Sequence, residues 1–137
     1  MSVESEKFIE SAFEYLKMDG EIHRRNAMSR AYFGFYHSVQ ESLVEIFPEE
    51  NLELKHQGLI DFLKNKENHT QSTIDSKVLV KLGIKLAEAK VKRHDADYKL
   101  NNGISPQDSE YSVKHAKQSL EFLWNECVHK RASNLEG

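Results

Sequence analysis

The chain has 137 residues, of which 39% are hydrophobic and 30% are charged, and its formal net charge is −3. This length predicts a single domain, residues 1–137, with one hydrophobic core. The acidic balance gives no general electrostatic support for binding nucleic acid, so such a role would need a local basic patch. The single cysteine, Cys127, excludes an internal disulfide and a multi-cysteine zinc site.

The sequence carries no signal for a membrane or for export. No apolar run approaches the roughly 20 residues that a membrane-spanning helix needs. The first residues, Met1 to Lys7, are charged and lack the hydrophobic stretch of a signal peptide. We therefore expect a cytoplasmic protein with no membrane contact.

The first two predicted helices form an antiparallel pair. Apolar residues spaced by three and four predict a helix that is capped by Ser2 or Ser5 and runs to about Met18. Asp19-Gly20 is a stop signal, and a second, longer helix follows almost at once over residues 22–47, a run without proline. Helices joined by so short a loop are usually neighbours.

Three further helices are predicted after Pro48. A short one covers residues 55–65 and is followed by a polar loop over residues 66–73, in which Thr73 can cap the fourth helix. The fourth helix has an apolar seam at three- and four-residue steps: Leu79, Leu82, Leu86 and Ala89. Ser105-Pro106-Gln107-Asp108 is a strong start signal for the fifth. The sequence therefore predicts an all-α, up-down bundle of about five helices.

The residues Ser29–His37 read Ser-Arg-Ala-Tyr-Phe-Gly-Phe-Tyr-His. At about 100° per residue, Arg30, Gly34, His37 and Glu41 share one stripe of the second helix. In a functional interpretation, the Arg30 guanidinium binds a phosphate and His37 transfers a proton. In the alternative, the stripe is buried and satisfied by neighbouring helices, with Glu41 balancing the charge. The surrounding aromatic residues indicate a helix that is central or faces a partner subunit.

Residues 90–98, Lys-Val-Lys-Arg-His-Asp-Ala-Asp-Tyr, hold the densest positive charge of the chain. Arg93 continues the leucine seam, at a place where another leucine would be expected. The run can form a phosphate-binding rim, with Arg93 as its anchor, Lys90 and Lys92 beside it and Tyr98 stacking on a base. Alternatively, Arg93 and Asp97 form an ion pair that closes the helix end.

The remaining histidines show no spacing typical of a metal site. His23, His69, His115 and His129 lie on segments that we predict to be exposed, and no glycine-rich phosphate loop is present. We therefore expect no metal and no cofactor.

Three segments in register resemble the HEPN superfamily, in particular its small stand-alone prokaryotic members. Ser29–His37 is similar to the family's Ser-Arg-Ala-Tyr-Tyr-Ala-Ala-Phe-His segment, and Lys55-His56 to its Lys-x-His feature. Residues 93–98 are similar to its Arg-x-x-Ala-Asp-Tyr signature. The likeness covers roughly residues 5 to 130.

The resemblance implies an all-α up-down bundle that forms a homodimer and binds RNA or nucleotides in the cleft between its subunits. Many HEPN proteins are metal-independent RNA endonucleases that act as toxins in toxin–antitoxin or phage-defence systems. They often pair with a nucleotidyltransferase-fold antitoxin. The alternative is a non-catalytic HEPN scaffold or dimerisation module that pairs with a nucleotidyltransferase-type partner.

In that family an arginine, four to six residues and a histidine form the catalytic motif. The arginine holds the scissile phosphate, and the histidine assists attack by the 2′-hydroxyl or protonates the leaving oxygen. Here no histidine follows Arg93 at that spacing, and Asp97 and Tyr98 lie in that region instead, with three and four residues between them and the arginine, whereas Arg30 and His37 fit the spacing on the earlier helix. The expected catalytic residues are Arg93, His37, Arg30 and His94, and the expected substrate-binding residues are Asp97, Tyr98, Lys90, Lys92 and His56. A dimer can bring Arg30 or His37 to Arg93 and Tyr98 of the other chain.

Overall fold

The structure, a computed structural model, describes residues 3–47, 55–70, 72, 74–101 and 103–129. Five α-helices account for most of them: α1 (Val3–Leu16), α2 (Glu21–Ile46), α3 (His56–Lys64), α4 (Ser76–Tyr98) and α5 (Pro106–Leu123). One 3₁₀ turn, η1 (Lys66–His69), follows α3, and a π-helical turn, η2 (Trp124–His129), continues α5. The described residues contain no strand, and the predicted all-α class is confirmed.

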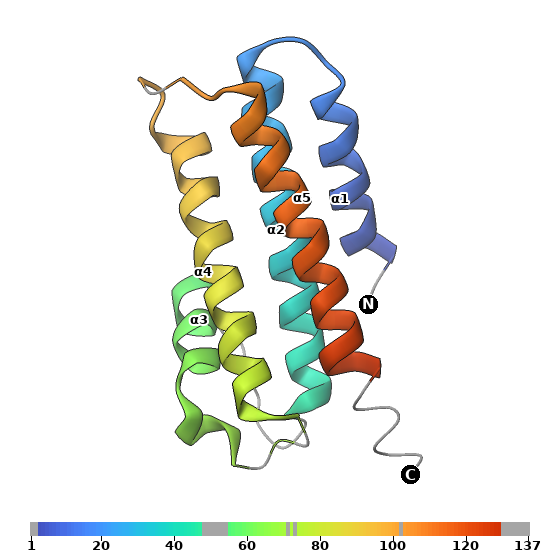
Figure 1. Cartoon of the computed structure of the whole chain (residues 1–137), viewed down its shortest axis with the longest axis vertical. Helices are drawn as coiled ribbons and strands as arrows, with labels where there is room; N and C mark the ends of the chain where they lie inside the picture. The colour runs from blue at the N-terminus through green and yellow to red at the C-terminus, as the bar shows by residue number, and fades with distance from the viewer. Residues whose placement is uncertain (1–2, 48–54, 71, 73, 102, 130–137) are drawn as a thin grey trace.

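The long helix α2 is the centre of an up-down bundle (Figure 1). The helices α1, α4 and α5 pack against it, and the direction of the chain alternates from α1 to α2 and from α4 to α5. Short α3 packs on the middle of α4 (Figure 1). In this arrangement α2 contacts α1, α4 and α5. Side chains from the middle of α2 therefore contribute to the centre of the core.

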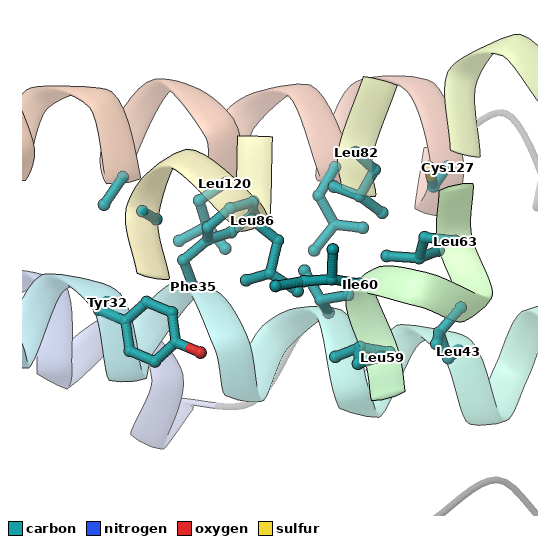
Figure 2. Close-up of a cluster of buried hydrophobic side chains, with 14 of the residues drawn as sticks. Tyr32, Phe35, Leu43, Leu59, Ile60, Leu63, Leu82, Leu86, Leu120 and Cys127 are labelled. Atoms are coloured by element: carbon teal, nitrogen blue, oxygen red, sulfur yellow. The ribbon is translucent and has the colours of Figure 1, made fainter. Parts of the chain in front are cut away.

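The core is a continuous apolar cluster between α2, α3, α4 and α5 (Figure 2). Phe35, at the middle of α2, is fully buried within it. The seam predicted on the fourth helix is confirmed, because Leu79, Leu82, Leu86 and Ala89 are all buried. Burial of each large side chain contributes about 1.5–3 kcal/mol, so this cluster is the main source of stability.

The ends of the helices match the sequence signals only in part. Ser105 caps α5 as predicted, since its Oγ accepts a hydrogen bond of 3.1 Å from the backbone N–H of Asp108. Asp75 caps α4, because its carboxylate accepts a bond of 2.8 Å from the N–H of Lys77. Ser5 lies inside α1 and does not cap it, while Ser2 and Thr73 lie outside the described residues.

A side chain from the start of α2 forms hydrogen bonds with the C-terminal end of α4, and the sequence did not indicate this contact. The buried side chain of Arg25 donates from Nη1 to three carbonyl oxygens: 2.9 Å to Ala96 and 3.3 Å to both Asp95 and Lys99. Its Nη2 lies 3.4 Å from the Glu21 carboxylate, which also accepts a bond of 2.7 Å from the N–H of Ile104. Arg25 thus supplies donors to carbonyls at the C-terminal end of α4, where the helix itself provides few, although the Asp95 carbonyl also accepts a bond of 3.2 Å from the N–H of Lys99.

Gly34 allows α1 to pack closely on α2. A Cβ atom at this position would lie 3.0 Å from the backbone oxygen of Ser5 and 3.0 Å from the Cβ of Phe8. We expect Gly34→Leu to lower the free energy of unfolding by about 2–3 kcal/mol, because the added side chain must push the two helices apart. Urea unfolding followed by circular dichroism measures the change.

Gly58 is the matched control for Gly34, because it is an exposed helical glycine on α3. Gly58→Ala is expected to raise stability by up to about 1 kcal/mol through helix propensity alone. A Gly34→Leu protein as stable as the wild type would contradict the close packing of α1 on α2.

Candidate functional site

Arg93 lies among aromatic rings near the C-terminal end of α4. Its guanidinium carbon is 5.3 Å from the ring centroid of Phe33, 5.8 Å from that of Tyr32 and 5.5 Å from that of Tyr98. The side chain keeps 20% of its surface exposed. Cation–π contacts therefore stabilise the guanidinium in a half-buried position that water still reaches.

The expected pairing of Arg93 with Asp97 is present. The Nε atom lies 2.8 Å from Oδ2 of Asp97, as an ion pair without hydrogen-bond alignment. The Ser29 hydroxyl donates to the same carboxylate oxygen at 3.4 Å. Neither terminal nitrogen of Arg93 makes a hydrogen bond to any residue that the structure describes. The ion pair therefore orients the guanidinium and leaves its outer edge available for an anion.

His56, at the start of α3, belongs to the same cluster. Its ring stacks on Tyr36 with 4.2 Å between centroids, and its Nδ1 shares a hydrogen bond of 2.5 Å with the Tyr32 hydroxyl. Burial lowers the pKa of His56, and the nearby charges of Arg93 and Lys90 lower it further. At neutral pH the ring is therefore uncharged and able to accept a proton.

Tyr32 determines which nitrogen of His56 is free. Burial raises the pKa of the Tyr32 hydroxyl well above its ordinary value, so the group keeps its proton. When Nδ1–H donates to the oxygen of this hydroxyl, Nε2 of the neutral imidazole carries no proton and can accept one. The bond to Tyr32 thus holds the His56 ring in a defined orientation beside Arg93. The sequence predicted His56 only as a substrate-binding residue.

The lowered pKa of His56 predicts a pH-dependent stability. Because the unfolded chain takes up the proton at an ordinary pKa of about 6.5 and the folded chain only at lower pH, folding is penalised as the pH falls below that value. We expect the wild type to lose more stability between about pH 7.5 and about pH 5 than His56→Gln does. Urea unfolding at both pH values measures the difference. Equal losses in the two proteins would show that His56 is not desolvated in the fold.

His37 contacts rings of this cluster, and Arg30 lies next to His37 over a ring of α1. The exposed His37 ring contacts Phe33, with 6.1 Å between centroids, and Tyr36, with 5.3 Å. The exposed Arg30 lies over the ring of Phe8 on α1, 5.8 Å from its centroid, and the His37 ring stacks on the same Phe8 ring with 5.9 Å between centroids. The interpretation of a buried polar stripe is therefore wrong, because only Gly34 of that stripe is buried.

The basic residues of α4 do not form one rim. Lys90 donates a hydrogen bond of 2.7 Å to Gln57 and, with His94, lines a shallow pocket between α3 and α4. Lys92 instead lines a different pocket, between α4 and α5. Arg93, Asp97 and Tyr98 gather at one place, and the His94 ring lies 5.0 Å from the Tyr98 ring. Lys90 is near enough to His56 to lower the pKa of that histidine. The predicted phosphate-binding rim over residues 90–98 is therefore wrong for Lys92, which lines the other pocket.

None of the remaining histidines that the structure describes is exposed as predicted: His23 and His115 are partly buried and His69 is buried, while the side chain of His129 lies outside the described residues. His69 was predicted to be exposed but is buried, with Nδ1 at 2.8 Å from the Ser76 hydroxyl and Nε2 at 3.3 Å from the carbonyl of Phe62. His115 is partly buried and lies 3.0 Å from Glu88. Within the described part of the chain, no three His, Cys, Asp or Glu side chains group in a way that could hold a metal ion. The same residues include no helix with the length and apolar character to cross a bilayer.

We call the surface formed by Phe33, Tyr36, His37, His56, Arg93 and Tyr98 the Arg93 face. Three helices contribute to it: α2, α3 and α4. Comparison of the chain with known protein families, curated proteins and solved structures gives no match. The function must therefore be argued from the geometry of this face.

Proposed function

We propose that this protein is a HEPN-type RNA-binding protein that holds an RNA phosphate at the Arg93 face. The observation that carries the proposal is the Arg93 side chain, which keeps 20% of its surface exposed and whose terminal nitrogens have no hydrogen-bond partner among the described residues. A guanidinium edge matches two oxygens of a phosphate. The rings of Tyr98 and Phe33 beside it offer surfaces on which unpaired bases can stack.

The same face has the groups for metal-independent cleavage of RNA, as expected for an endonuclease toxin of a toxin–antitoxin or phage-defence system. The neutral His56 would accept the proton of the ribose 2′-hydroxyl as that oxygen attacks phosphorus. Arg93 would stabilise the charge on the phosphate oxygens. The 5′-oxygen would leave and take a proton from a second imidazole, for which exposed His37 is the candidate. The products are a 2′,3′-cyclic phosphate and a free 5′-hydroxyl.

The alternative is a non-catalytic scaffold that pairs with a nucleotidyltransferase-type partner. One observation favours it: the Asp97 carboxylate lies 2.8 Å from Arg93 and offsets part of its charge. Under this alternative, the exposed rings of the Arg93 face would contact a protein rather than RNA. Both functions are compatible with a homodimer that has this face in its cleft.

RNA binding and cleavage separate these possibilities. Fluorescence anisotropy with a labelled single-stranded RNA, at increasing salt, is expected to show saturable, salt-dependent binding. Incubation of total RNA with the protein in EDTA is expected to give cleavage that is lost in His37→Ala and His56→Gln. Binding without cleavage would favour the scaffold, and no binding at low salt would contradict the proposal. Light scattering after gel filtration measures whether the protein is a dimer.

A further inference from the structure

We propose that a second pocket, between α2, α4 and α5, binds a small planar aromatic anion. This α4–α5 pocket has a volume of about 470 Å³, which is in the range of small-molecule sites. The helices α4 and α5 run side by side (Figure 1). The residues that line the pocket come from both of these helices and from α2. It is distinct from the Arg93 face, although Tyr32 of α2 both lines the pocket and contacts Arg93.

The bottom of the pocket is apolar, and two aromatic rings form one of its sides. Met28, Ala89 and Ala116 are buried and line it, and the two alanines leave room above them. On α5 the Tyr111 ring stacks on the His115 ring, with 6.0 Å between centroids. A flat aromatic wall over an apolar floor favours a planar ring as the ligand. Tyr111 keeps 59% of its surface exposed, so a ligand would cover an aromatic ring that now faces water.

The charges of the pocket select an anion. The imidazole of His115 already lies 3.0 Å from the carboxylate of Glu88. Lys92 also lines the pocket, and its ammonium has no ion pair or hydrogen bond with a residue in the described ranges. A carboxylate or phosphate on the ligand would therefore meet an unpaired positive charge.

Ser112 adds a polar group on the pocket wall. Its Oγ atom is buried and makes no hydrogen bond to the described residues. Buried hydroxyl groups are nearly always hydrogen-bonded, so a ligand heteroatom that reaches Ser112 would satisfy a group that the protein leaves without a partner. The ligand class is thus a planar ring with one anionic substituent and a hydrogen-bonding atom.

Three probes with the same ring test the charge requirement: indole-3-acetate is an anion, indole-3-ethanol is neutral and tryptamine is a cation. In ¹H–¹⁵N NMR titrations of the full chain, we expect saturable shifts of the Ser112 and Ala116 amides with indole-3-acetate. The affinity is expected to fall about tenfold for the neutral probe and further for the cation.

Two substitutions test the assigned groups without touching the core. Lys92→Met is expected to weaken binding of indole-3-acetate about tenfold, whereas Lys81→Met, an exposed lysine of α4 outside the pocket, should leave it unchanged. Tyr111→Ala removes the aromatic side of the pocket and should weaken the binding of all three probes. Equal affinity for the three probes, an unchanged affinity in Lys92→Met, or no saturable shift at millimolar indole-3-acetate would overturn the proposal. None of these results depends on RNA binding at the Arg93 face.

Discussion

Replacing Arg93 by alanine is expected to weaken binding of single-stranded RNA by about 10- to 100-fold. The guanidinium edge is the charged donor that faces outward from the Arg93 face, and hydrogen bonds to a charged group contribute about 1.5–3 kcal/mol. Because one phosphate contact is lost, the slope of log K against log salt should fall by about one. Fluorescence anisotropy over a series of salt concentrations measures both quantities.

Two further variants show whether the effect belongs to the guanidinium. Arg93→Lys keeps the charge but loses the planar fork, so we expect an intermediate affinity with an unchanged salt slope. Lys81→Ala removes an exposed charge near the N-terminal end of the same helix, α4. This variant should bind RNA with the affinity of the wild type. If Arg93→Ala, folded by circular dichroism, binds RNA normally, the assignment of the Arg93 face is wrong. If cleavage is observed in the wild type, it should fall with the same substitution.

Replacing Phe35 by alanine is expected to lower the free energy of unfolding by about 3–5 kcal/mol. The side chain is fully buried at the middle of α2, where α1, α4 and α5 all pack on this helix. Its removal leaves a cavity that rigid helices on several sides cannot fill. Urea unfolding monitored at 222 nm is the measurement, and the midpoint should shift to lower urea with a similar slope.

Two control substitutions give a scale for the loss of stability in Phe35→Ala: a conservative one at the same position and one at an exposed position of the same helix. Phe35→Leu keeps most of the apolar volume and should cost less than about 1.5–2 kcal/mol. Val44 lies on the same helix with 55% of its surface exposed, so Val44→Ala should change stability by no more than about 0.5 kcal/mol. A loss of below about 1 kcal/mol in Phe35→Ala would contradict the central position of α2.

The sequence predicted best those features that lie on one helix. The leucine seam of α4 delivers Arg93 to the face of α2, and the four-residue step to Asp97 gives the observed ion pair. Both follow from the period of the α-helix alone. The same period could have corrected the predicted basic rim, since Lys90 and Lys92 are about 200° apart around the helix and cannot share one edge.

Contacts between helices could not be predicted in the same way. His56 reaches the Arg93 face because α3 packs on α4, and nothing in the residues near His56 indicates which side of that helix pair it will occupy. Its bond to Tyr32 joins residues that are 24 positions apart. His69 is buried although its sequence neighbours are polar, because the ring bonds to Ser76 and to the carbonyl of Phe62. Such burial depends on the tertiary fold and not on local hydropathy.

The bonds from Arg25 to the last carbonyls of α4 have a consequence for how the molecule can be divided. A peptide of residues 76–129, which contains α4 and α5, would lack the donors that end α4 in the whole protein. Its last turn, with Tyr98 and Asp97, would fray even if the rest stayed helical. The environment of Arg93 is therefore a property of the complete bundle, and an excised hairpin that contains every residue of that turn would not reproduce it.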